Sequence, residues 1–184
     1  MSMKETELKI KILGDGCLRK KSSHVQKFTD ERRQVLSRMA RIMYESSGIG
    51  LAAPQVGINE MMIVVDAGNG LYKVINPKIV KQEGSQSMEE GCLSVPGICI
   101  KVKRAKKILV EGLDEFGSAV KIEAENLLAC VFQHEIDHLK GKLIIDYASF
   151  LDKIKISSKL KELRKRARSQ KLSESERKTC QLQL

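Results

Sequence analysis

The chain has 184 residues, of which 42% are hydrophobic and 30% are charged, and these values predict one globular domain over residues 1–184. No apolar run approaches the ~20 residues that a membrane-spanning helix needs, and the first residues lack the apolar stretch of a signal peptide. We therefore expect no membrane partner and a cytoplasmic location.

The five cysteines are odd in number and widely spread, which favours free thiols in a reducing compartment over disulfides. The net charge of +10 is concentrated near the C-terminus, where eight basic residues between Lys153 and Arg168 accompany only Asp152 and Glu162 as acidic neighbours. Such a segment could attract phosphate groups, and it supports the alternative of a non-enzymatic module that binds ribosomal RNA. The simpler interpretation is a solvated helix face.

The first half of the chain predicts a helix followed by a hairpin. An N-cap sequence at Thr29 precedes apolar residues at three- and four-residue spacing, which predicts a helix that ends near Gly48. Residues 61–65 and 72–75 have strand composition and flank a glycine-rich turn, so we expect them to pair. Pro77 is expected to close the second strand.

The middle of the chain predicts further antiparallel sheet. Residues 98–102 and 107–113 have strand composition, and 119–122 are expected to pair back across the turn that separates them from 107–113.

Helical spacing returns in the last third of the chain. Apolar residues recur with a helical period from Glu125 to Gly141, and residues 143–145 then predict a short strand. A C-terminal helix is expected through residues 154–163, and we expect residues 166–184 to form a polar, flexible tail.

His134 and His138 lie four residues apart on the predicted helix at 125–141, with Glu135 directly after the first. Residues four apart share one face of a helix, so the two imidazoles can hold a divalent metal while Glu135 serves as a general base. Taken alone, this pattern also occurs in helices that bind no metal.

A catalytic metal site of this type needs a third protein ligand. No histidine follows His138, and the downstream carboxylates Glu162, Glu174 and Glu176 lie in the basic tail. A zinc endopeptidase would take its third ligand from that region, and this enzyme class remains the alternative. Upstream, Cys92 offers a thiolate, and a Cys-His-His site is the better account.

The segment from Gly48 to Gly57 is rich in glycine and small residues. It matches neither a dinucleotide-binding nor a Walker pattern, because no strand precedes it and no Lys-Ser/Thr follows. The spacing of Gly48 and Gly50 suits a backbone that approaches another group closely, and Gln55 adds a neutral amide donor. A helix stop followed by a tight turn is the simpler interpretation of the segment alone.

Three segments, Gly48–Gln55, Glu90–Ser94 and Gln133–His138, together resemble peptide deformylase in order and approximate spacing. The resemblance extends over roughly residues 8–165. It implies an α+β fold in which antiparallel β-sheets surround a central metal-binding helix, with an N-terminal helix and a C-terminal helix.

The resemblance also implies an activity. The family removes the formyl group from the N-terminal formyl-methionine of newly made polypeptides and releases formate. By position, Cys92, His134 and His138 would bind the metal. Water activated by the metal would attack the formyl carbon while Glu135 moves a proton from that water to the departing amine.

Further residues acquire roles from the same resemblance. The backbone N–H of Leu93 and the side-chain amide of Gln55 would stabilise the negative oxygen of the tetrahedral intermediate. The substrate backbone would add as a strand, and a pocket would take the methionine side chain. The substrate-binding residues implied are Gly48, Ile49, Gly50, Gly91, Cys130 and Val131.

The implied cofactor is one divalent metal ion per chain, with Fe²⁺ expected in the cell and Zn²⁺, Ni²⁺ or Co²⁺ able to substitute. The implied partners are N-formyl-Met nascent polypeptides, with ribosome contact through the basic C-terminal helix and none with DNA; the location is the bacterial cytoplasm. The chain departs from many family members at Cys99, where they have an Arg or Gly nearby, and any substrate contact from that position is in doubt.

Overall fold

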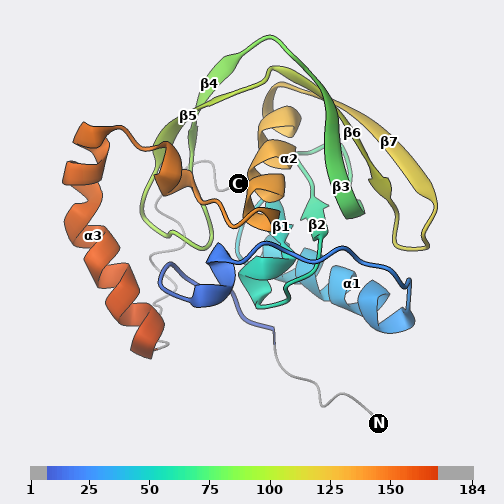
Figure 1. Cartoon of the computed structure of the whole chain (residues 1–184), viewed down its shortest axis with the longest axis horizontal. Coiled ribbons are helices and arrows are strands. Elements are labelled where there is room, and N and C mark those ends of the chain that lie inside the picture. The colour runs from blue at the N-terminus through green and yellow to red at the C-terminus, as the bar shows by residue number, and fades with distance from the viewer. Residues whose placement is uncertain (1–7, 170–184) are drawn as a thin grey trace.

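The computed structural model describes residues 8–169, which form two antiparallel sheets and three α-helices (Figure 1). The larger sheet has the strand order β1-β2-β3-β6-β7. Its strands are β1 (Gly50–Ala52), β2 (Met62–Val65), β3 (Tyr72–Glu83), β6 (Lys107–Leu113) and β7 (Ala119–Glu125). The smaller sheet pairs β4 (Gln86–Glu90) with β5 (Ile100–Arg104). The predicted α+β class with antiparallel sheets is confirmed.

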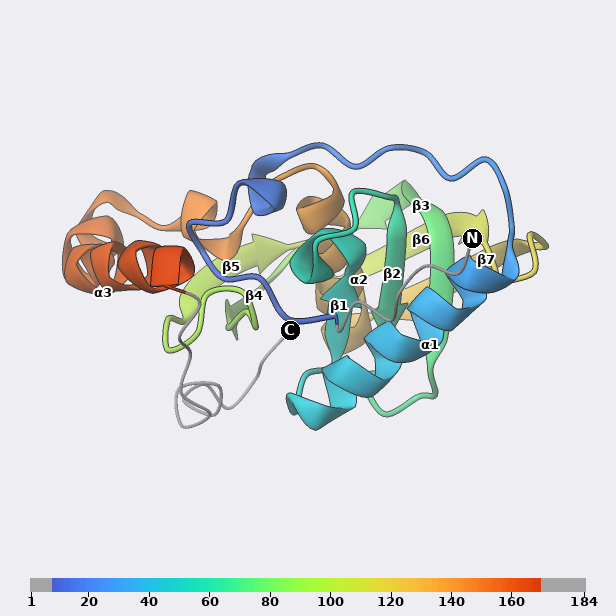
Figure 2. The same cartoon turned by 90° about the horizontal axis from the view of Figure 1, so that it is seen from below.

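The α-helices are α1 (Asp30–Glu45), α2 (Asn126–Leu139) and α3 (Phe150–Ser169). Helix α2 lies at the centre, while α1 and α3 lie towards opposite ends of the molecule in both views (Figures 1 and 2). Three short 3₁₀ helices, η1 (Gly16–Arg19), η2 (Ala53–Val56) and η3 (Ile144–Tyr147), connect these elements. Within the described part of the chain, no helix has the length and apolarity needed to cross a bilayer.

Strand β2 explains why α1 and α2 both pack on the larger sheet. Its side chains alternate between two faces, so Ile63 and Val65 join the apolar cluster around α2, whereas Met62 and Val64 join the cluster around α1. Because both faces are covered, β2 is apolar at every position. A third apolar cluster lies under β5, η3 and α3, where Leu163 is fully buried.

The predicted helices at 29–48 and 125–141 and the hairpin of 61–65 with 72–75 are present. The end predicted for the second hairpin strand is wrong, because β3 continues past Pro77 to Glu83. Proline lacks the N–H that a regular ladder needs, and the register of β3 against β6 shifts between Ile75 and Lys78 to accommodate it.

Three other predictions need correction. The strand expected at 98–102 begins only at Ile100, and its partner β4 was not predicted at all. Residues 144–147 form the 3₁₀ helix η3 rather than a strand, because the Asp146 carboxylate accepts a hydrogen bond from the Leu143 N–H at 2.9 Å and closes a local turn. The part of the expected flexible tail that is described, 166–169, is helical; the rest lies outside the described residues.

Candidate metal centre

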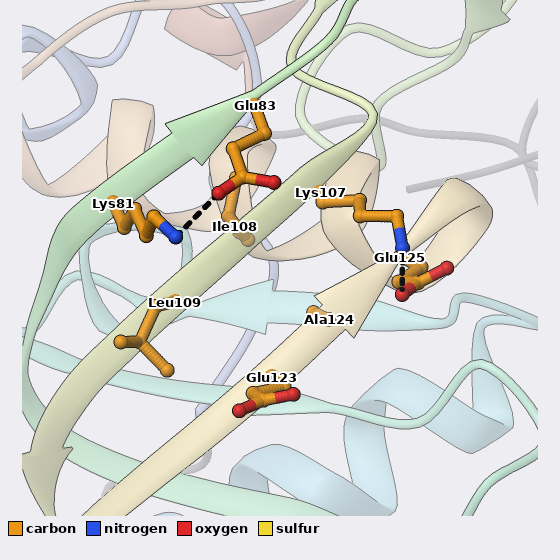
Figure 3. A pocket seen from close by; sticks show the side chains of 8 residues that line it. All are labelled: Lys81, Glu83, Lys107, Ile108, Leu109, Glu123, Ala124 and Glu125. Carbon is orange, nitrogen blue, oxygen red and sulfur yellow. Dashed lines mark ion pairs between the residues drawn. The ribbon is translucent and has the colours of Figure 1, made fainter.

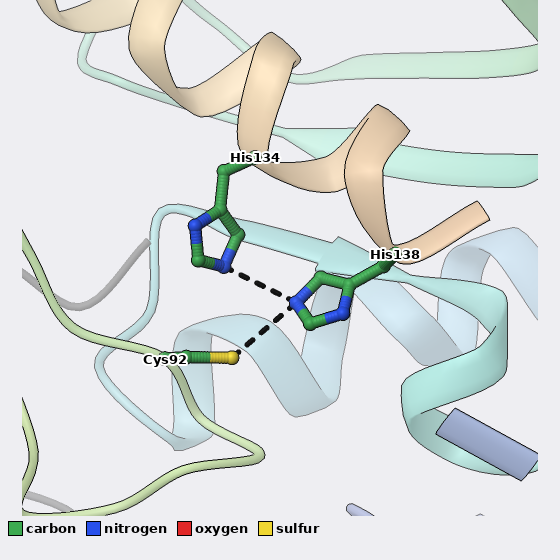
Figure 4. A group of neighbouring side chains, drawn as sticks. All are labelled: Cys92, His134 and His138. Carbon is green, nitrogen blue, oxygen red and sulfur yellow. Dashed lines mark hydrogen bonds between the residues drawn. The ribbon is translucent and has the colours of Figure 1, made fainter. Parts of the chain in front are cut away.

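Helix α2 carries two imidazoles that face the same point. The ring centroids of His134 and His138 are 4.9 Å apart, with 73° between the ring planes. Their Nε2 atoms are 3.1 Å apart, and both side chains are buried (Figure 4). The helical spacing seen in the sequence therefore places two nitrogen donors side by side.

Cys92 joins the histidines from a distant part of the chain. It lies just after β4, and its Sγ is 3.3 Å from the Nε2 of His138. One donor atom from each of Cys92, His134 and His138 lies within 4.8 Å of the other two. We refer to these three residues as the Cys-His-His cluster.

The donors of the cluster fit a divalent transition metal. One sulfur and two imidazole nitrogens match the ligands that such metals take in proteins, and three protein ligands leave a coordination position open. Burial lowers the pKa of His138 well below its usual value, which keeps the imidazole neutral and able to bind a metal. Burial also raises the pKa of Cys92, so this thiol requires a nearby positive charge, such as a metal ion, to ionise.

Glu135 is fully buried, and neither of its carboxylate oxygens has a hydrogen-bond partner among the described residues. Burial raises the pKa of Glu135 well above its usual value, and the charge of Glu90 adds to the rise. Buried polar atoms without partners are costly and uncommon. Glu135 can therefore form hydrogen bonds with a polar ligand, and its buried position and raised pKa make it a candidate for proton transfer.

Gly48, just before β1, and Gly50, the first residue of β1, allow the main chain to lie very close to side chains of the site. A Cβ added at Gly50 would lie 2.3 Å from the Oε1 of Glu135 and 2.8 Å from a methyl group of Val131. A Cβ at Gly48 would lie 2.8 Å from the side chain of Leu93. The structure therefore shows the close backbone approach that the glycine spacing suggested.

Gln55 and Leu93 both lie next to Cys92. Gln55 is fully buried in η2, where its Oε1 accepts a hydrogen bond from the Ala52 N–H at 2.7 Å. This bond orients the side chain so that its Nε2 points to the Sγ of Cys92, at 3.7 Å. Leu93 directly follows Cys92 and is buried, as is Gly91 directly before it.

The substrate-binding residues implied by the resemblance include Ile49, Cys130 and Val131. Cys130 and Val131 are fully buried on α2, and Ile49 packs against the apolar cluster around that helix. The Sγ of Cys130 lies 3.3 Å from the Sδ of Met88 and 3.3 Å from the Nε2 of Gln86. Both contacts come from β4, a strand too polar to be recognised from its sequence.

The downstream carboxylates do not supply a ligand where the structure describes them. Glu162 lies on α3 and pairs with Arg166 and Lys159, and it is not part of the cluster. Glu174 and Glu176 lie outside the described residues. Within residues 8–169, the third donor beside the histidines is Cys92.

The expectation of free thiols holds for three cysteines, namely Cys17, Cys92 and Cys130. It is wrong for Cys99, which is disulfide-bonded. The odd number and the wide spread of the five cysteines gave no indication of this bond.

A separate hollow of about 260 Å³ lies on β3, β6 and β7 (Figure 3). Its charged side chains pair with one another, since Lys81 binds Glu83 at 2.5 Å and Lys107 binds Glu125 at 2.7 Å. The hollow contains no residue of the Cys-His-His cluster and is a solvated face of the sheet.

Comparison with known proteins connects this geometry to a family. The model of a family described as polypeptide deformylase matches residues 7–154. The peptide deformylase of Halothermothrix orenii is 50% identical over 141 residues, which cover 76% of this chain and 92% of that protein. The peptide deformylase of Fusobacterium nucleatum is 48% identical over 161 residues, which cover 85% of this chain and 92% of that protein.

Solved structures agree with these sequence matches. A crystal structure of a peptide deformylase from Legionella pneumophila has a TM-score of 0.81 at 40% identity and covers 90% of this chain and 99% of that one. The structure of a peptide deformylase from Synechococcus elongatus in complex with actinonin has a TM-score of 0.80 at 38% identity. It covers 86% of this chain and 89% of that one.

Proposed function

This chain belongs to the polypeptide deformylase family, and we propose that the Cys-His-His cluster is the centre at which it removes the formyl group from N-formylmethionyl peptides. The reaction cleaves the formamide C–N bond with water and gives formate and a free amine. We further propose that residues 1–184 form a single catalytic domain.

One observation carries this assignment. The buried Cys-His-His cluster lies beside Glu135, a buried carboxyl group whose oxygens have no partner among the described residues. The three donors suit a metal, and the carboxyl group is available for proton transfer.

A divalent metal bound by Cys92, His134 and His138 would supply Lewis-acid activation of water and of the substrate carbonyl. Glu135 accepts the proton of the attacking water and delivers it to the departing nitrogen. Its buried setting raises its pKa, which favours its role in carrying the proton from the water to the nitrogen. Removal of bulk water from the site also strengthens each of these interactions.

The developing negative charge on the formyl oxygen needs hydrogen-bond donors. We assign this role to the side-chain N–H of Gln55, whose orientation is fixed by its bond to Ala52, and to the backbone N–H of Leu93. The substrate main chain would pair with Gly48 and Ile49, just before β1, with Gly50 at the start of β1, and with the segment at Gly91. Cys130 and Val131 would contact the methionine side chain.

We propose Fe²⁺ as the metal in the cell, with Zn²⁺, Ni²⁺ or Co²⁺ able to replace it, because thiolate and imidazole ligands suit all four ions. Iron beside a thiolate is open to oxidation. Protein prepared without oxygen should therefore have higher specific activity than protein prepared in air, and equal activities would contradict iron.

We also propose a location in the bacterial cytoplasm and contact with the ribosome through α3. The exposed side of α3 carries lysines such as Lys153, Lys161 and Lys165, and Phe150 and Leu151 are exposed at its start. Positive charge of this kind attracts the phosphate backbone of RNA.

The deciding experiment measures formate release from a formyl-Met peptide by anaerobically prepared protein with its metal content determined. The Glu135→Gln variant keeps the shape of the side chain but cannot accept the proton, so we expect a rate lower by about 10²–10⁴-fold with unchanged metal content. Metal-loaded wild-type protein that releases no formate would overturn the proposed function.

A Cys92→Ala variant separates this function from that of a zinc endopeptidase. A deformylase site that depends on the thiolate should lose most of its metal, whereas an endopeptidase with a downstream ligand would retain it.

A further inference from the structure

A second buried carboxylate, that of Glu90, contacts the cluster at His134. Glu90, the last residue of β4, is fully buried and accepts a bond from the Nδ1 of His134 at 3.0 Å. It also accepts two bonds from Arg104, at 2.7 Å from Nε and 2.9 Å from Nη2.

The same arginine connects this carboxylate to the surface. The Nη1 of Arg104 donates to Asp137 at 2.5 Å, and the hydroxyl of Tyr147 donates to the same Asp137 oxygen at 2.6 Å. The guanidinium group also lies 4.9 Å from the centroid of the Tyr147 ring. Tyr147, in η3, is 38% exposed, so the chain of contacts runs from solvent to the ligand His134.

The contact with Glu90 selects which ring nitrogen of His134 carries the proton. The Glu90 carboxylate is paired with Arg104 through two hydrogen bonds and only accepts, so the proton of a neutral His134 is on Nδ1. The lone pair is then on Nε2, the atom that faces His138 and Cys92. The Nδ1 of His138 has no partner among the described residues. A carboxylate therefore selects the tautomer of His134 but not that of His138.

The same ion pairs connect the segment that carries Cys92 to the helix that carries His134 and His138. Glu90 and Arg104 end the two strands of the β4–β5 hairpin, and Cys92 lies two residues beyond Glu90. Asp137 lies on α2 between the two histidines. The ion pairs of Arg104 with Glu90 and Asp137, all of them largely buried, therefore join the hairpin that carries the thiol to the helix that carries the imidazoles.

We propose that Glu90, Arg104, Asp137 and Tyr147 form a positioning network that holds His134 and Cys92 in place for metal binding, with the Tyr147 hydroxyl as its outer end. This inference rests on the proposed function, because it assumes that the Cys-His-His cluster binds a metal. The network contacts no reacting atom, and it sets metal affinity through the orientation of the ligands.

The inner end is tested with Glu90→Gln. The amide can donate as well as accept, so it no longer selects one tautomer of His134. We expect the affinity for cobalt(II), measured by competition with a chelator, to fall by roughly 10–100-fold. The visible absorption of the cobalt-loaded protein should shift, because the ligand geometry changes.

The outer end is tested with Tyr147→Phe, which keeps the ring against Arg104 and removes only the hydroxyl. Because this removes one hydrogen bond to Asp137, we expect a fall in cobalt(II) affinity of about 2- to 10-fold. This variant decides the matter if Glu90→Gln does not fold, since the changed group is partly exposed.

The chain provides matched controls for both changes. Glu60 accepts two bonds from Arg32, and the hydroxyl of Tyr44 donates to Asp66 at 2.7 Å. The Glu60→Gln and Tyr44→Phe variants therefore break equivalent bonds away from the cluster, and we expect wild-type cobalt(II) affinity for both. Thermal unfolding of the metal-free proteins measures general destabilisation separately from metal affinity.

The outcomes are distinguishable. Cobalt(II) affinities within twofold of wild type in both network variants, or equal losses in the controls, would overturn the positioning network. A loss in Glu90→Gln alone would overturn the part assigned to Tyr147. Wild-type protein that binds cobalt(II) but releases no formate would overturn the proposed function and leave the network to be judged by the affinities.

Discussion

At Gly50 the main chain of β1 comes so close to α2 that no side chain fits between them. Its neighbours are the Oε1 of Glu135 and a methyl group of Val131, so the position of this glycine determines how the strand edge and the carboxyl group face one another. By contrast, a Cβ at Gly16 would meet no atom within 4 Å.

We expect Gly50→Ala to lower the free energy of unfolding by about 1–3 kcal/mol, because the added methyl group overpacks the site. Formate release should fall as well, because Glu135 is displaced. The Gly16→Ala variant should stay within about 0.5 kcal/mol of wild type. Urea unfolding and formate assays measure both effects, and equal stability of the two variants would contradict the close contact at Gly50.

Asp146 joins the N-terminal part of the chain to η3. It accepts two bonds from Arg19, at 2.5 and 3.0 Å, and one from the Leu143 N–H. Burial works to raise the pKa of Asp146, but the bonds from Arg19 and Leu143 lower it overall. An acid whose folded-state pKa is lowered stabilises the fold above its unfolded pKa and loses that contribution as the pH falls through its folded pKa.

For Asp146→Asn we expect a loss of up to about 1 kcal/mol of stability at pH 7, since the ion pair is partly exposed. The difference from wild type should shrink as the pH falls below the ordinary aspartate pKa of about 3.9. Unfolding measured at pH 7 and at pH 3 checks this, and a difference that does not depend on pH would contradict it.

At the scale of elements, Gln133 holds α2 against the connection between β5 and β6. Its side chain accepts from the Ala105 N–H at 3.0 Å and donates to the Ala105 carbonyl at 3.0 Å, as one strand residue would to another. It donates as well to the carbonyl of Ala129. The helix that carries the histidines is therefore held against the sheets by these hydrogen bonds as well as by the packing of its apolar side chains.

The Gln133→Ala variant leaves the N–H and carbonyl of Ala105 without this partner, so we expect a loss of about 1–3 kcal/mol in stability. Gln34 is exposed on α1, and Gln34→Ala should change stability by less than about 0.5 kcal/mol. Urea unfolding of both proteins without metal makes the comparison. A loss at Gln133 no larger than that at Gln34 would show that the contact contributes little.

Elements with a strong local pattern were predictable from the sequence. Helices α1 and α2 bury a repeating set of apolar residues, and β2 is apolar throughout, so their spacing alone indicates them. Strand β4 is different, because its five residues are mostly polar and it is defined by pairing with β5. Such a strand forms only against a partner that is distant in the sequence, so its own residues show no periodic pattern of apolar side chains.

At the scale of the whole molecule, α3 lies at the far end from α1 (Figure 2). One side of the helix packs into the third apolar cluster through Leu163, Leu160 and Ile156. The lysines lie on the exposed side. The helix is therefore part of the fold, and its charge is best tested by substitution rather than by removal.

We expect a triple variant with Lys153, Lys161 and Lys165 changed to Glu to sediment less with ribosomes than wild type. The salt dependence of binding should become shallower by about one unit of slope for each phosphate group that the helix no longer binds. Deformylation of free formyl-Met peptides should be retained, because the helix contributes no residue to the Cys-His-His cluster.

Lys20, Lys21 and Lys27 are exposed elsewhere on the molecule, and their replacement by Glu serves as the control. Each Lys→Glu change removes two charge units, so both triple variants have a formal net charge of +4 instead of +10. Equal ribosome binding by the two variants would show that total charge matters and that α3 has no special role.

The sequence by itself determined the family and the helix that carries His134 and His138, and it predicted Glu135 as the base, because these depend on residues a few positions apart or on motifs that keep their order. Only the tertiary structure decided which side chains support them. Glu90, Arg104, Asp137 and Tyr147 come from two strands, a helix and a 3₁₀ helix. Their hydrogen bonds exist only after those elements have packed, so no local pattern could reveal them.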